Sequence, residues 1–366
     1  MTVKLVLENL KHRPVRSLLS VFLIGIPVTL ILSLVGITQG LLDDSARRAR
    51  GTGADILVRP PGSSIMTLSG APMPEKLVSV LAERPRVKVA TGMVTHPVSS
   101  LTYVAGIDLD AFNRLSGGFE YVEGGPFHGR REILVDSDFA YQRGLHAGST
   151  VNLLNTDWRV AGVVRPGKLS RLFAPIGVLQ ELTSNTGKIS QIFITVKRPE
   201  YLQKEVEELK ALLPGYGIYP IDEFVSQFTA ENVQGGAVNT FINVVIGIGV
   251  VIGFAVVLLS MYMAVLQRTR EIGILKSLGA SRWFILKIIL IEAVLMGFFG
   301  TVLGILMSFV GRWIIMETMP ASIIQAVVPS WWPIAGAITL VGVILGALYP
   351  GLRAARQDPI EALAYE

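Results

Sequence analysis

Few residue groups in this sequence combine the types and spacing that catalysis requires. Gly162 to Leu169 fits the phosphate-binding pattern G-x-x-x-x-G-K, but Leu169 stands where a Mg²⁺-binding Ser or Thr is needed, and the pattern follows a strand without opening a helix. The four His residues lack metal-ligand spacing, the chain has no Cys, and Asp136 and Asp138 fit turn and helix-cap roles. We therefore predict no catalytic residues, no metal site and no cofactor bound by this chain, and we expect that it is not an enzyme.

Glu292 is the one charged residue within the longest apolar runs of the chain. Ionisable groups inside a membrane usually mark a transport or proton path. Glu292 lies roughly 7 Å beyond Lys287 along a helix, so a structural role and a coupling role are both open. No ring of charge and no inverted repeat with broken helices favours an ion channel or a proton-driven carrier.

Composition places the chain in a membrane. Hydrophobic residues make up 51% of the 366 residues and charged residues 17%, against about a quarter charged in soluble domains. The net charge of +5 does not indicate nucleic acid, because residues 43–237 carry 21 basic and 21 acidic side chains, which leaves 12 basic and 7 acidic ones in the apolar parts and their flanks.

Four apolar runs are each long enough to cross a bilayer, which takes about 20 helical residues. The short segments rich in Lys and Arg should be cytoplasmic. We therefore expect a protein of the inner (cytoplasmic) membrane with both termini on the cytoplasmic side and residues 43–237 on the opposite side. The predicted order is a cytoplasmic amphipathic helix over 1–17, spans over 18–42, 238–266, 288–311 and 331–352, an extracytoplasmic domain with stalks over 43–237, a cytoplasmic coupling segment over 267–287, an outer loop over 312–330 and a cytoplasmic tail over 353–366. Arg312 is expected to extend to the outer interface.

The outside domain has a mixed α/β pattern. Short β-branched or aromatic runs predict strands over 55–59, 88–95, 101–107, 133–135, 150–154, 158–164 and 192–196. Helices are predicted over 74–83 and 199–213, each with Pro in its first turn, and over 137–143 before Gly144. The predicted fold class is thus a four-helix membrane protein, one span plus three, with an extracytoplasmic α/β module that carries a β-rich insertion. Residues 43–50 and 222–234 are expected to be helical stalks.

The segment between the second and third spans is the most informative. Residues 268–278 predict a short helix with Ile272, Leu275 and Leu278 on one side, which Gly279 ends before Ser281 caps the third span. Such a helix suits a groove in a cytoplasmic partner, and an interfacial helix lying on anionic lipid is the alternative. The residues assigned to this contact are Arg268, Arg270, Glu271, Ile272, Leu275, Lys276, Leu278, Gly279, Ser281 and Arg282.

The C-terminal tail repeats this cationic, helical character. Asp358 is a predicted N-cap with Pro359 at the first helical position and Glu361 at the third, opening a last helix over 360–365. Together with Arg353 and Arg356, these residues form the predicted C-terminal cytoplasmic contact.

Each span contains two Gly residues four positions apart, a spacing that permits close helix contacts within a subunit or across a dimer. The pairs at Gly249 and Gly253 and at Gly300 and Gly304 are predicted packing sites. Since four spans alone form a thin bundle, we expect a homodimer.

These cytoplasmic motifs resemble a known family. The sequence RTREIGILKSLGASRWFILKIILIEA, residues 268–293, is similar to the signature of the FtsX/MacB-type permeases of ABC transporters, and RAARQDPIEALAYE, residues 353–366, is similar to their C-terminal motif. Residues 8–20 resemble the family's entry into its first span. Gln267 and Ala364 differ from the Glu and Arg that are frequent there.

The resemblance implies that residues 271–281 form a coupling helix on an ATPase subunit, with ATP and Mg bound by that partner. Because the sequence carries no fused nucleotide-binding domain, two copies of a separate ATPase on a permease homodimer are the expectation, with membrane lipid around them and no nucleic acid. A periplasmic adaptor or a cell-wall hydrolase is a further partner that the resemblance leaves open.

The resemblance also implies a mechanism, mechanotransmission, in which ATPase closure moves the stalks and the outside domains. The expected function is export or extraction of a lipid, lipoprotein, peptide or drug-like molecule. The alternative is a non-transporting, FtsX-like switch that activates a cell-wall hydrolase or signals across the membrane.

Overall fold

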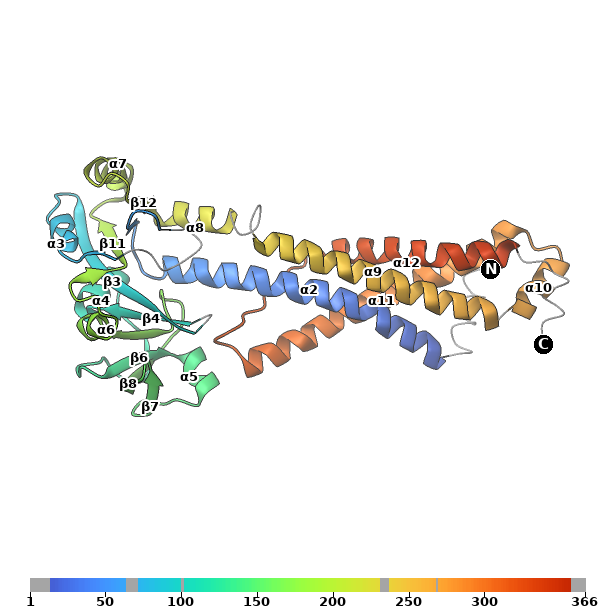
Figure 1. Cartoon of the computed structure of the whole chain (residues 1–366), viewed down its shortest axis with the longest axis horizontal. Helices are drawn as coiled ribbons and strands as arrows, with labels where there is room; N and C mark the ends of the chain where they lie inside the picture. Colours follow the sequence, from blue (N-terminus) through green and yellow to red (C-terminus); the bar gives the residue numbers. More distant parts are fainter. Residues whose placement is uncertain (1–13, 64–71, 100–101, 231–236, 268, 357–366) are drawn as a thin grey trace. The chain divides into compact units, whose positions relative to one another are not determined.

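The structure, a computed structural model, describes residues 14–63, 72–99, 102–230, 237–267 and 269–356. The chain divides into two compact units (Figure 1). The first contains residues 1–39, 238–314 and 325–366, and the second contains residues 40–237 and 315–324. The predicted N-terminal helix over 1–17 falls mostly outside the described residues, and α2 is described from Pro14.

The first unit is built from long apolar helices. Its helices are α2 (Pro14–Arg50), α9 (Ala237–Gln267), α10 (Thr269–Ser277), α11 (Arg282–Thr318) and α12 (Trp331–Arg356). Four of them are long and apolar enough to cross a membrane, all but α10. This confirms the four predicted spans. Arg312, whose side chain was expected to reach the interface, donates from Nε to the carbonyl of Gln325 at 2.9 Å.

The second unit is an α/β domain on a ten-stranded sheet. Its strands are β1 (Ile56–Arg59), β3 (Val87–Ser99), β4 (Thr102–Ile107), β5 (Tyr121–Gly124), β6 (Glu132–Asp136), β7 (Thr150–Leu153), β8 (Thr156–Val164), β9 (Leu172–Pro175), β11 (Gln191–Val196) and β12 (Gly217–Pro220). The order is β12-β1-β11-β3-β4-β9-β6-β8-β5, with β7 beside β8. Only β4–β9 and β6–β8 pair in parallel among the described strands. A separate small sheet joins β2 (Met73–Pro74) and β10 (Lys188–Ile189).

Strands from the two ends of this domain form one half of the sheet. The block β12-β1-β11-β3 comes from both ends of the domain's sequence, and the strands from the middle, β4 to β9, continue the same sheet. The predicted α/β module with a β-rich insertion is confirmed, and the insertion extends the module's sheet.

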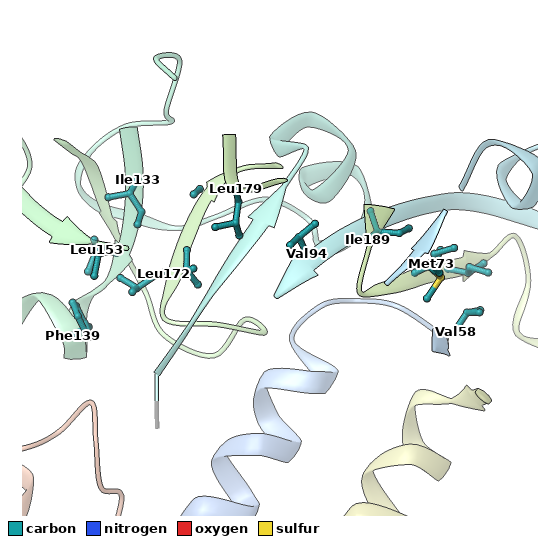
Figure 2. Close-up of a cluster of buried hydrophobic side chains, with 14 of the residues drawn as sticks. Val58, Met73, Val94, Ile133, Phe139, Leu153, Leu172, Leu179 and Ile189 are labelled. Atoms are coloured by element: carbon teal, nitrogen blue, oxygen red, sulfur yellow. The ribbon is translucent and has the colours of Figure 1, made fainter. Parts of the chain in front are cut away.

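Both faces of the sheet are covered. The period-two alternation of strands sends Ile56, Val58, Ile192 and Ile194 to one face, where they pack in the core that Figure 2 shows. The helices α3 (Leu77–Ala82), α5 (Ser137–Arg143), α6 (Ile176–Leu182) and α7 (Leu202–Leu212) contribute to this core; the 3₁₀ turn η1 (Pro199–Tyr201) leads into α7.

The opposite face meets a second core. Leu57 and Phe193 point there, and the contributing helices are the end of α2, α4 (Leu109–Ser116) and α8 (Ile221–Ala230). This is the face on which the stalk segments pack. Residues 43–50 are helical, as predicted, because α2 continues to Arg50. The second predicted stalk is helical over Ile221–Ala230, and its residues 231–234 lie outside the described part of the chain.

Three predictions about element bounds are wrong. The first helix of the domain begins at Leu77, and Pro74 lies in strand β2 paired with Lys188, because an extended partner strand outweighs the preference of Pro for a first helical turn. The predicted β-rich insertion is richer in helix than expected, since α4 and α6 lie within it. The outer loop predicted over 312–330 is helical as far as Thr318.

Candidate functional site

The short helix α10 is defined by clear end signals. Its last turn closes with the Ala280 N–H donating to the carbonyl of Leu275 at 3.0 Å, and Gly279 has φ +90°, a left-handed conformation that suits Gly. Ser281 Oγ then accepts from the backbone N–H of Phe284 at 3.2 Å and caps α11. The stop at Gly279 and the cap at Ser281 are confirmed. A tight turn between these two residues therefore connects α10 to α11.

The apolar residues of this segment divide between the core of their own unit and its exposed surface. Ile272 is buried in the membrane unit's core, and Leu275 packs against that core. Leu278 and Trp283 are 79% and 73% exposed. Ile272 and Leu275 therefore share one side of α10, as predicted, and Leu278 does not lie on that side. The exposed large apolar side chains of the segment are Ile274, Leu278, Trp283 and Phe284. The assignment of Ile272, Leu275 and Leu278 to a partner contact stays a prediction.

The end of α12 holds α10 in place. Lys276 Nζ donates to the carbonyl of Ala355 at 3.1 Å. Arg353 donates from Nη1 to the hydroxyl of Tyr262 at 3.0 Å, and its guanidinium stands 5.4 Å from the centre of that ring. The predicted coupling segment and the start of the predicted tail thus meet within one unit.

Several predicted contact residues are not described in full. Arg268 and the tail residues Asp358, Pro359 and Glu361 lie outside the described residues, as does the predicted helix over 360–365. Arg270 and Glu271 belong to α10 by their backbone. Arg282 begins α11 and is exposed, and Arg356 ends α12 and is exposed as well.

Glu292 lies inside the membrane unit. It is 4% exposed on α11, between Ile289 and Ala293 of the same unit's core. A buried carboxylate in this setting is engaged by its neighbours. Both the structural and the coupling role stay predictions.

The Gly residues of the spans differ in how closely their neighbours approach. A Cβ on Gly300 would stand 2.5 Å from Ile24 Cγ2, and one on Gly304 would stand 2.7 Å from the carbonyl of Gly25. These two residues lie where α11 crosses α2. Gly249 and Gly253 have ordinary distances of 3.8 and 4.0 Å to α2, so the contact there does not require Gly.

The segment from Gly162 to Leu169, which fits the phosphate-binding pattern in sequence, does not form a loop that opens a helix. Gly162 lies within β8, and the chain proceeds from Gly167 to strand β9 without a helix. Lys168 Nζ donates to the carbonyl of Ser116 at 2.7 Å. No group of three or more His, Asp or Glu side chains suited to a metal occurs among the residues that the structure describes.

A buried ion cluster fixes the end of α2 to the outside domain, and the sequence analysis missed it. Asp136 Oδ2 accepts from Arg48 at 3.2 Å and from Arg171 at 3.1 Å, and Arg48 Nε also donates to Asp44 at 2.8 Å. Asp136 is 1% exposed. Burial raises the pKa of Asp136 above its ordinary value, while the two guanidinium groups oppose that rise. The same carboxylate caps α5, since Oδ1 accepts from the Phe139 N–H at 2.8 Å.

Helix α5 also binds the segment that follows α11. Gln142 Oε1 accepts from the backbone N–H of Ala321 at 3.0 Å, and its Nε2 donates to Ser322 Oγ at 3.0 Å. The Tyr141 hydroxyl donates to Glu317 at 2.8 Å. One short helix thus contacts, directly or through Asp136, the ends of α2 and α11 that belong to the second unit.

The fold defines a membrane protein with an extracytoplasmic-type α/β domain, and two family models match it. Residues 17–212 match the MacB-like periplasmic core domain, and residues 243–359 match the FtsX-like permease C-terminal domain. The chain therefore belongs to the MacB/FtsX family of ABC transporter permeases. An ATPase partner is implied by that membership.

Several relatives carry the same description. The chain is 31% identical over 62% of its length to an ABC transporter permease of Methanocaldococcus jannaschii and 29% identical over 60% to the permease YknZ of Bacillus subtilis. The macrolide export ATP-binding/permease protein MacB of Escherichia coli is 24% identical over the whole chain. The matches span 59%, 55% and 60% of those relatives' own lengths.

A solved structure of the extracellular domain of a noncanonic ABC-type transporter YknZ from Gram-positive bacteria matches 45% of the chain and 99% of that domain. Its sequence identity is 16% and its TM-score 0.35. The family assignment rests on the two sequence models.

Proposed function

We propose that this chain is the membrane subunit through which a separate ATPase moves the extracytoplasmic domain to export or extract an amphipathic substrate. Two ATPase copies act on a homodimer of this chain, and both termini face the cytoplasm. The Lys and Arg residues that flank the spans on one side support this orientation. The name of the MacB relatives, which are macrolide exporters, supports a drug-like cargo.

The exposed end of α10 carries this proposal. Large apolar side chains on a rigid, capped helix favour a partner that buries them, and hot-spot residues of interfaces include Trp. Leu278 and Trp283 are exposed on either side of the Gly279 turn, while Ile272 and Lys276 hold the helix to its own unit. Force applied at Leu278 would therefore reach α11 and α12 through contacts that already exist.

The test is co-purification of the ATPase with the Leu278→Asp variant. A carboxylate placed in an apolar contact loses the burial of Leu and leaves an unpaired charge, a cost of about 3 kcal/mol or roughly a hundredfold in affinity. We expect the ATPase to be lost while the permease stays in the membrane. The measurement is the ratio of ATPase to permease in an affinity pull-down.

Leu275→Asp is the matched comparison on the same helix. Because Leu275 packs inward, this variant should lower the thermal stability of the membrane unit, which Leu278→Asp should not do. Full recruitment of the ATPase by a stable Leu278→Asp variant would remove α10 from the proposed interface.

A further inference from the structure

The outside domain contains a cavity of about 340 Å³ that the proposed coupling does not use. Its lining comes from the end of α2, from α8, from one face of the sheet and from the segment after α11, all within the second unit. Protein interiors contain few voids larger than a water molecule, and small-molecule sites begin at about 300 Å³. The cavity therefore has the size of a ligand site.

The walls of this cavity are apolar over most of their extent. Leu57 and Phe193 line it from the sheet, and Ile221, Phe224 and Val225 line it from α8. On α2 the facing residues are the small Ala46 and Ala49, which leave the space open. An apolar chain would fit against these side chains.

A buried amide stands in the lining. Gln191 follows the alternation of β11 onto the same face as Phe193, it is 2% exposed, and its Nε2 has no hydrogen-bond partner among the described residues. Buried amide groups are nearly always paired, because an unpaired donor costs about 1–3 kcal/mol. An occupant with a hydrogen-bond acceptor, such as an ester carbonyl, would supply the missing partner.

One part of the wall is ionic and balanced in charge. Asp44, Arg48 and Arg171 line the cavity, and their hydrogen bonds run to one another and to Asp136. Because carboxylates and guanidinium groups are both present, this end favours a zwitterionic head group over a purely anionic one.

The cavity is lined by residues that follow two apolar runs of the sequence. Leu41 lies at the end of the first apolar run, Ala321 lies three residues beyond the end of α11, and both line the cavity. The cavity is therefore lined in part by residues that directly continue two of the spans along the chain.

We propose that this cavity binds a single-chain, zwitterionic amphipath from the outer leaflet, with its chain against Phe193 and Phe224 and its ester carbonyl toward Gln191. The inference goes beyond ATPase coupling and needs only the proposed orientation of the chain. An occupant would contact α2, α8 and the sheet together. Its binding would therefore affect the segments at the base of both stalks.

The test uses the full chain in lipid nanodiscs without an ATPase. The probe is lysophosphatidylcholine with a diazirine on its acyl chain, and labelled residues are located by mass spectrometry after illumination. We expect labels at Phe193, Phe224 or Val225. Ala46→Trp should abolish them by filling the cavity, whereas Ala211→Trp, on the exposed side of α7, should leave them unchanged. Equal labelling of the Ala46→Trp variant, or labels confined to the spans, would overturn the proposal.

Gln191→Met is the second variant, which tests binding in the cavity if Ala46→Trp fails to fold. Removing an unpaired buried amide should leave thermal stability unchanged or higher, while loss of one hydrogen bond should weaken probe binding about three- to tenfold. Unchanged binding with lowered stability would show a purely structural role and overturn the assignment of Gln191. A chain that binds the probe but recruits no ATPase would contradict the proposed function and leave this inference standing.

Discussion

At the scale of single residues, Asp136 joins a helix cap and an ion cluster in the second unit. It caps α5 and pairs with two guanidinium groups that are themselves nearly buried. The cap is predictable from sequence, because Asp136 precedes a short helix that ends at Gly144 with φ +61°. Its ion partners are not, because Arg48 and Arg171 lie 88 and 35 residues away and no local pattern connects them.

Asp136→Asn should destabilise the outside domain by about 3 kcal/mol. Asn keeps the capping oxygen but removes the buried negative charge that Arg48 and Arg171 share, which leaves these two cations with Asp44 and the more exposed Asp138. The measurement is hydrogen exchange over residues 133–143 of the full chain, which should lose protection. Asp138→Asn is the control, because Asp138 is more exposed than Asp136 and its contact with Arg171 is longer, at 3.5 Å. This substitution should change stability by less than about 1 kcal/mol. Equal effects of the two substitutions would contradict the central place of Asp136.

At the scale of elements, periodicity and caps identify most helices and the strands with buried alternation. The strands that escaped prediction have weak patterns: β5 is exposed along its whole length, and β9 and β12 are four residues long and end in Pro. The division of α10 into anchoring and exposed side chains was likewise out of reach, because it depends on the end of α12 lying against the helix.

Gly304→Ala should weaken the crossing of α2 and α11. The added Cβ would meet Val28 Cβ at 2.6 Å and the Gly25 carbonyl at 2.7 Å, both too close for the helices to keep their spacing. We expect a loss of about 1–3 kcal/mol in the stability of the membrane unit, measured by thermal unfolding in nanodiscs. Gly253→Ala should be neutral or stabilising by up to about 1 kcal/mol, because its nearest neighbour is 4.0 Å away and Ala favours helix. A Gly304→Ala variant with unchanged stability would contradict this expectation, because it would show that α2 and α11 can move apart at no cost.

At the scale of the whole molecule, the order of spans and the mixed α/β class follow from hydropathy and from the resemblance of the cytoplasmic motifs, and both are confirmed. The continuation of the insertion strands into the module's own sheet could not be predicted, because pairing between distant strands leaves no local signal.

The proposed orientation is testable with single cysteines, since the natural chain has none. Ser277→Cys on α10 and Ser226→Cys on α8 are both at exposed positions. In intact cells a membrane-impermeant maleimide should label the cysteine at position 226 and spare the one at position 277. Permeabilised cells provide the control, in which both should react. The reverse pattern in intact cells would invert the topology.

The most direct measurement of nucleotide-driven motion is the distance between two spin labels, one on each copy of the Ser226→Cys chain, in the complex with its ATPase. Trapping the ATPase with ATP and vanadate should shift this distance distribution away from that of the nucleotide-free complex, and Leu278→Asp should abolish the shift. Identical distributions in a complex that still hydrolyses ATP would contradict the claim that the chain carries motion from the cytoplasm to its outside domain.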